Sequence, residues 1–264
     1  MKAMHVASAT VLLAILPIST NAHLAAQPIT GDEVARRVEA RDRGEDGRLR
    51  LEMRLYDHRG RETVRKLTVL TRRQDELDSV ILRFDYPGDI RDTGFLSREH
   101  SGGEDDRYLF LPALGRSRRI SSQEKQDSFV GSDFTYEEIT GRSLEDYTYR
   151  LLGEDSVDGR PAYVLESAAK RSDAKYPRAV SRVDAERFII LRSEIFGRSE
   201  ERVKEFAAER VEKVDGVWTA LEQTMRSLRD GTHTTIEVLE AKYNLGLSRG
   251  AFTRTTLERG GGLP

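Results

Sequence analysis

The stretch RLRLEMRLY, residues 48–56, alternates apolar and charged side chains without a break. The apolar members at every second position are Leu49, Leu51, Met53 and Leu55. A period of two places all four on one face of an extended chain and the charged residues on the other. The stretch therefore predicts a β-strand with one buried face and one solvated face.

Similar extended segments follow along the rest of the chain. TVRKLTVLTRR (63–73) comes after a turn at 57–61, and LDSVILRFDYPGD (77–89) places Val80, Leu82 and Phe84 on one face before Pro87-Gly88 ends it. Further extended runs cover 108–122, 147–167, 187–197, 211–227 and 234–246. Asp158-Gly159 and Asp215-Gly216 predict hairpin turns. The charged, alanine-containing region 197–216 is interpreted as a strand at its centre because its neighbours alternate.

One helix is predicted near the start, in ITGDEVARRVEARDRG (29–44). Thr30 is the expected N-cap, Glu33 its capping-box partner, and Gly44 the stop. Val34 and Val38 lie four residues apart and give a narrow apolar stripe, so the helix can lie over a sheet without being buried all round. We predict that it acts as a lid, with the segment 32–42 as the moving part.

So many strands with few helices predict a mainly β (α+β) domain, built as a curved antiparallel sheet or barrel. In YLFLP, Tyr108 and Phe110 lie opposite Leu109 and Leu111. A strand that is apolar on both faces must be covered on both. The concave side is where an apolar ligand would bind, unless side chains fill it; the sequence leaves both alternatives open.

Composition and the N-terminus indicate the compartment. The 264 residues are 38% hydrophobic and 33% charged, with a net charge of −2, which argues against nucleic acid as a partner. VASATVLLAILPI (6–18) followed by small residues predicts a cleaved signal peptide, residues 1–22, because the apolar run is too short to span a membrane. With no cysteine for a lipid anchor, we expect a periplasmic monomer with one domain, 23–258, and a flexible tail, 259–264.

Signatures of catalysis are scarce. His23, His58, His100 and His233 have no metal-ligand spacing, so we expect no metal or other cofactor. Ser122 and Lys125 fit the Ser-x-x-Lys pattern, but their neighbours are polar and predict a loop rather than a buried helix start. The acidic runs 103–106 and 153–159 match no calcium loop. We expect no enzymatic activity.

The segment FVGSDFTYEEITG (129–141) is rich in aromatic residues. We predict that Phe129, Phe134 and Tyr136 lie on the rim or wall of the cavity, with Ser132 or Asp133 capping a short helix. The alternative is that the three rings are ordinary core.

Several segments, in order, resemble the bacterial outer-membrane lipoprotein-sorting family, the LolA-like periplasmic carriers. They are RFDYPGDIRDTGFL (83–96), RYLFLPALGRSRRI (107–120), FVGSDFTYEEI (129–139), LLGEDSVDGRPAYVLE (151–166) and VDGVWTALEQTMRS (214–227). The resemblance covers nearly all of the region from Thr30 to Leu257.

This resemblance implies an incomplete β-barrel with helices plugging an apolar cavity, and a carrier that takes a lipoprotein acyl chain or another lipid between the inner and outer membranes. An inner-membrane transporter and an outer-membrane acceptor would be its partners. The cargo-binding residues predicted are Leu49, Leu51, Met53, Leu55, Val80, Leu82, Phe84, Phe110, Phe129, Phe134 and Tyr136, with Val34 and Val38 on the lid. The alternative function is a non-catalytic adaptor of an envelope transporter, with a filled core.

Overall fold

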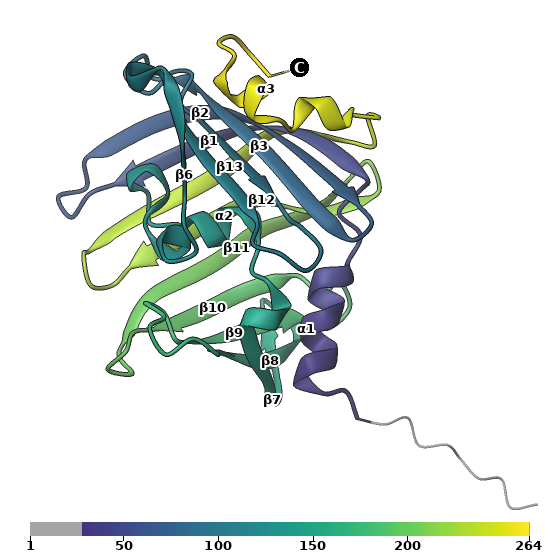
Figure 1. Ribbon diagram of the computed structural model, residues 1–264. Helices are drawn as coiled ribbons and strands as arrows, with labels where there is room; N and C mark the ends of the chain where they lie inside the picture. The colour runs from purple at the N-terminus through teal and green to yellow at the C-terminus, as the bar shows by residue number, and fades with distance from the viewer. Residues whose placement is uncertain (1–27, 264) are drawn as a thin grey trace, which may run out of the picture.

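In this computed structural model, which describes residues 28–263, thirteen antiparallel strands form one sheet with three short helices beside it (Figure 1). The strands are β1 Asp46–Tyr56, β2 Glu62–Gln74, β3 Leu77–Tyr86, β4 Gly94–Arg98, β5 Asp106–Leu111, β6 Arg116–Arg119, β7 Tyr147–Val157, β8 Arg160–Ala169, β9 Arg178–Asp184, β10 Ile190–Phe196, β11 Arg202–Val214, β12 Val217–Ser227 and β13 Thr232–Tyr243. The helices are α1 Gly31–Ala40, α2 Tyr136–Thr140 and α3 Arg254–Glu258.

The sheet consists of two meanders that meet in the middle. Its order is β6-β5-β4-β3-β2-β1-β13-β12-β11-β10-β9-β8-β7, so β1 pairs with β13 while β6 and β7 remain as edges. The sheet curls into a deep trough that does not close (Figure 1). The predicted architecture, a curved antiparallel sheet forming an incomplete barrel, is confirmed.

Strand β1 shows how the alternating pattern works. Leu51 faces Leu67 of β2 and Val238 of β13 in the sheet register, and all three side chains lie on the concave face. Strand β11 covers the centre of the charged region 197–216, so that interpretation is also confirmed.

Two of the hairpins have the turns that their sequences predict. Asp158 and Gly159 have φ values of +50° and +78°, and Asp215 and Gly216 have +47° and +89°. Two successive residues with positive φ match the right-handed twist of the flanking strands, which is why Asp-Gly is favoured there.

Strands β2 to β5 have buried apolar side chains on both faces. On the concave face, Leu109 belongs to the main core cluster with Met53 and Phe129. On the convex face, Phe110 belongs to a second cluster beneath α3, which includes Leu257. The prediction that a doubly apolar strand is covered on both faces is confirmed.

Helix α1 begins as predicted but ends early. The Thr30 hydroxyl accepts a hydrogen bond from the Glu33 backbone N–H at 3.2 Å, as an N-cap does. The Glu33 carboxylate, however, accepts from the arginines at 36 and 37 instead of completing a capping box. The helix stops at Ala40 because Arg41 is extended, with ψ at 149°. Gly44 as the stop was wrong; its positive φ serves the turn into β1.

Three elements were missed in the sequence, and a fourth was expected with the wrong cap. Strands β4 and β9 and helix α3 had no sequence signal that we recognised. Helix α2 was expected with Ser132 or Asp133 as its cap, which is wrong: Thr135 caps it, in a capping box with Glu138. The Asp133 carboxylate instead accepts hydrogen bonds from Thr232 and Thr234 of β13.

The C-terminal segment is attached to the convex face. Arg83, which is buried, donates to the backbone carbonyls of Thr256, Leu257 and Gly261. Leu263 is buried in the second cluster. That residues 259–264 are flexible, and that 23–258 form one domain, stay predictions. The predicted signal peptide, 1–22, and His23 lie outside the described residues.

Candidate functional site

A cavity of about 540 Å³ lies between the concave face of the sheet, α1 and the segment around α2. Apolar side chains from eight strands form most of its wall. They include Leu49, Leu51, Met53, Leu67, Val69, Val80, Leu82, Leu165, Ile195, Phe206, Met225, Ile236 and Val238. The trough is therefore not completely filled by side chains, which the sequence had left open.

Seven of the predicted cargo-binding residues line this cavity. They are Leu49, Leu51, Met53, Val80, Leu82, Phe129 and Phe134. Phe84 and Tyr136 are buried in the core around it without lining it, and Leu55 packs against the same core. Phe110 lies on the opposite face of the sheet beneath α3, because its neighbour Leu109 occupies the concave side. Whether the seven hold a cargo stays a prediction.

The segment 129–141, which we call the plug, covers part of the trough with its aromatic residues. The Phe129 ring stacks on Phe84 at 6.0 Å and meets Phe95 and Tyr136 edge-on at 5.9 and 5.5 Å. Arg65 of β2 donates to the Val130 carbonyl at 2.6 Å. Phe129 and Phe134 are thus both core residues and cavity wall, so the two alternatives drawn from the sequence are not exclusive.

Helix α1 lies beside the β7–β9 end of the sheet (Figure 1), and its residues Ala35, Val38 and Glu39 line another side of the cavity. Val38 lines the cavity, whereas Val34 is fully buried against Leu165 and Val183. The first turn touches the edge strand so closely that a Cβ on Gly31 would stand 2.7 Å from the Arg150 backbone. Only glycine fits this contact, which fixes α1 on β7 at one end.

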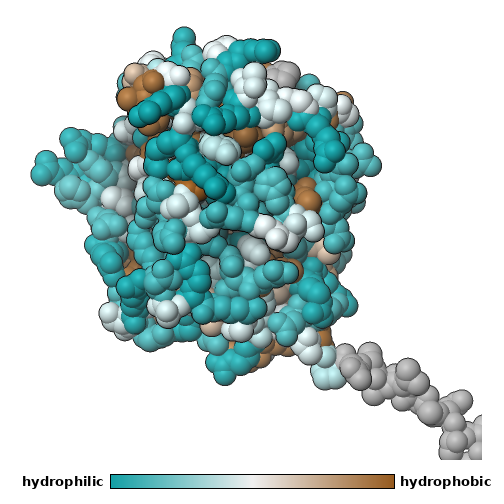
Figure 2. Space-filling model, viewed as in Figure 1, coloured by the Kyte–Doolittle hydropathy of each residue, from teal (hydrophilic) through white to brown (hydrophobic). Residues whose placement is uncertain are grey.

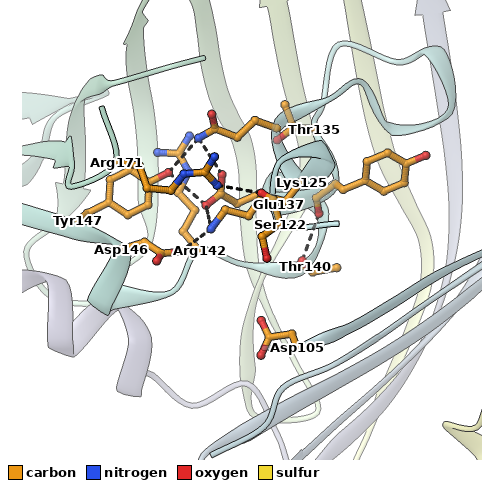
Figure 3. Close-up of polar contacts among 12 residues, drawn as sticks. Asp105, Ser122, Lys125, Thr135, Glu137, Thr140, Arg142, Asp146, Tyr147 and Arg171 are labelled. Atoms are coloured by element: carbon orange, nitrogen blue, oxygen red, sulfur yellow. Dashed lines mark hydrogen bonds and ion pairs between the residues drawn. The ribbon is translucent and has the colours of Figure 1, made fainter. Parts of the chain in front are cut away.

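Buried charges attach the plug to the sheet beside the cavity. Glu138 of α2 accepts from Lys204 of β11 at 2.8 Å and forms an ion pair with Arg142 at 3.4 Å. Its neighbour Glu137 accepts from the Tyr147 hydroxyl at 3.1 Å and pairs with Lys125 at 3.6 Å. Lys125 also binds Asp146 (Figure 3).

No pattern in the sequence predicted this charge network. Lys125 and Lys204 are both nearly inaccessible to solvent, although a lysine in a polar stretch is normally exposed. Lys125 was placed in a polar loop, and no local pattern marked either lysine as buried. The network balances three carboxylates with three cations, as buried charges require.

The charge network predicts an acid-sensitive step in stability. Burial acts to raise the Glu138 pKa, but the charges of Lys204 and Arg142, together with hydrogen bonds from Lys204 and the Thr135 backbone, outweigh it and hold the pKa below its ordinary 4.5. A carboxyl whose folded pKa is depressed stabilises the protein above the unfolded pKa and loses that contribution as pH falls through the folded value. We expect Glu138→Gln to lower the free energy of unfolding at pH 7, with the gap to wild type shrinking below about pH 4.5.

Urea unfolding of both proteins between pH 7 and pH 3 tests this expectation. Glu240→Gln is the matched control, because that carboxylate is exposed. A constant gap between wild type and Glu138→Gln at every pH would contradict the role assigned to Glu138.

The Ser-x-x-Lys pattern does not form a catalytic pair. Lys125 forms ion pairs with two carboxylates, Glu137 and Asp146, and the Ser122 hydroxyl donates to Glu104 instead of facing Lys125. Across residues 28–263, no group of three or more potential metal ligands comes together. His58, His100 and His233 lie on separate elements. No helix in that range is long and apolar enough to cross a membrane.

Known proteins resemble this one along most of the chain. The model of a family described as "Uncharacterized protein" matches residues 76–259, more than half of the sequence. No curated protein sequence matches significantly. A solved DUF1329 family protein from Desulfovibrio piger is 29% identical, with a TM-score of 0.80, over 86% of this chain and 97% of that one.

Two further solved structures share the fold. A domain from Vibrio parahaemolyticus described as outer membrane lipoprotein-sorting is 28% identical with a TM-score of 0.81, over 87% of this chain and 98% of that one. A LolA superfamily protein from Nitrosomonas europaea is 18% identical with a TM-score of 0.69, over 87% and 100%. The resemblance inferred from the sequence is confirmed. The chain belongs to the family whose model spans residues 76–259, and its fold is that of the LolA superfamily and of outer membrane lipoprotein-sorting proteins.

Proposed function

We propose that this protein is a periplasmic carrier that binds the acyl chain of a lipoprotein, or another hydrophobic lipid, and shuttles it between the inner and outer membranes. The observation that carries the proposal is the apolar cavity of about 540 Å³ between the sheet, α1 and the plug. This volume lies within the roughly 300–1,000 Å³ of pockets that bury a small ligand.

The chemistry of the wall suits an acyl chain. Each methylene group moved from water into such a cavity contributes about 0.8 kcal/mol. No covalent step is needed, so the protein acts without a catalytic residue. The polar exterior visible in Figure 2 would keep a carrier soluble while its cargo stays inside.

The described role of one similar protein supports the same function. The Vibrio parahaemolyticus domain is described as lipoprotein-sorting, and a lipoprotein sorted to the outer membrane must cross the periplasm. An exported single-domain monomer that meets a transporter at the inner membrane and an acceptor at the outer one fits this role.

Release requires an opening, and α1 is the element proposed to move. Its Val38 lines the cavity, and charged residues cover its outer side. A cargo buried behind a packed helix leaves only when that helix shifts, so lid opening would set the rate of transfer.

Extraction of the protein purified from periplasm with organic solvent, followed by mass spectrometry, tests the proposal. We expect a stoichiometric lipid, displaced by a fluorescent fatty acid. A protein that carries no lipid and does not bind the probe would contradict the carrier function and favour the adaptor.

A further inference from the structure

One end of the cavity differs from the rest of its wall. Five charged residues lie where α1 ends and where β2 and β3 meet, and all five line the cavity: Glu39, Arg41, Arg43, Arg73 and Asp78. Charged residues of the plug network, Glu137, Glu138 and Arg142, also reach the wall, but they are paired with one another or with buried lysines. The cavity thus has a mainly apolar body and a strongly polar end beside α1, which is the shape of an amphiphile.

The two carboxylates at this end are already shared between two arginines. Arg43 pairs with Glu39 at 2.5 Å and with Asp78 at 2.9 Å. Arg73 lies 3.6 Å from Glu39 and 3.5 Å from Asp78. A third carboxylate, Glu99, lies behind them and accepts from the Asp78 backbone N–H.

Arg41 is left without a carboxylate. Within residues 28–263 it makes no ion pair, and its one hydrogen bond runs from Nη1 to the Val38 carbonyl at 3.0 Å. Its Nε–H is buried with no partner in that range. Burial and then the charge of Arg43 lower the Arg41 pKa to about 10. Arg41 is half-buried, and the nearby Glu39 and Asp78 offset only part of the cost of its charge beside Arg43, so an anion that joined it would be favourable.

We propose that the cargo is a single-chain amphiphile with an anionic oxyacid headgroup, a carboxylate or a phosphate monoester, whose headgroup binds Arg41 while its chain lies along the apolar wall. This inference rests on the proposed carrier function and specifies its substrate class. A guanidinium is the side chain best suited to hold such a group, because its planar N–H donors match two oxygens at once.

Displacement of a fluorescent fatty acid by ligands with the same chain and different heads tests the inference. Hexadecanoate, hexadecyl phosphate and hexadecanol are compared on wild type, Arg41→Gln and Arg41→Lys. We expect wild type to bind one or both acids about tenfold or more tightly than the alcohol, since hydrogen bonds to charged groups are worth that much. Arg41→Gln should bind acid and alcohol equally, and Arg41→Lys should restore part of the preference.

Arg36→Gln is the matched control, because that arginine lies exposed on the same helix and pairs with Glu33. It should keep the wild-type preference. Inorganic phosphate should not displace the probe; displacement that depends on Arg41 would indicate a free-anion site and overturn the proposal.

Two further outcomes distinguish failure of the headgroup inference from failure of the carrier function. If wild type and Arg41→Gln both bind acid and alcohol equally, the headgroup inference is wrong while the carrier function stands. If wild type binds no ligand of the series, the carrier function fails and the inference fails with it. The comparison of the two acids identifies which oxyacid is preferred.

Discussion

Leu51→Glu is expected to abolish acyl-chain binding while the protein stays folded. Leu51 lies in the middle of the sheet, between Leu67 and Val238 in the register, and all three line the cavity. A carboxylate there meets the hydrocarbon of the cargo and must either lose its water or hold water in the cavity; both oppose binding. We expect the affinity for a fluorescent fatty acid to fall about a hundredfold or more, since the loss of roughly 3 kcal/mol already gives that factor.

The position is chosen so that the fold survives. Leu51 is only half-buried, so a longer polar side chain can reach the cavity water, whereas Met53 on the same strand is fully buried. A charged residue in place of Met53 would unfold the protein, so a loss of binding in that variant would not test the cargo site.

Leu239→Glu is the matched control, because Leu239 follows Val238 on β13 but points to solvent and is 49% exposed. It should bind the probe as wild type does. Equal, undiminished affinity in both variants, with unchanged circular dichroism, would show that the ligand does not use this cavity.

Much of the fold was predictable because strand alternation is a local signal. The period of two in residues 48–56 gave β1 its orientation, and the Asp-Gly pairs located two hairpins. Short strands escaped notice: β4 has five residues, and four of them are buried, so no alternation is visible. The end of α1 was misplaced because a glycine with positive φ serves a turn as readily as a helix stop.

The site was only partly predictable, since a cavity depends on which strands face each other. The side chains on β1 and β3 were chosen correctly for the concave face, but Phe110 was assigned to the wrong face because both faces of β5 are apolar. The ion pair between Glu138 and Lys204 joins residues 66 positions apart, and nothing in either local sequence marks it.

Phe129→Ala is expected to be the most destabilising single change in the plug. The ring is fully buried, and it contacts Phe84, Phe95 and Tyr136 at once. Its removal loses the transfer free energy of the ring and leaves a hole, which costs about 3–5 kcal/mol for a buried phenylalanine. The plug backbone is held on both sides of the ring by several hydrogen bonds, among them Arg65 to the Val130 carbonyl and the Asp133 N–H to the Thr234 hydroxyl, so it cannot collapse to refill the space.

Urea unfolding measures this loss, with Leu114→Ala as the control. Leu114 is 59% exposed on the loop after β5, and its truncation should change the free energy of unfolding by less than about 0.5 kcal/mol. Because Phe129 also lines the cavity, its removal should enlarge the space available to cargo, so that bulkier lipids displace the probe more easily than in wild type. A loss below about 1 kcal/mol would mean that the plug is not part of the cooperative core. In that case the segment 129–141 would be a second movable cover of the cavity, and α1 would not be its only lid.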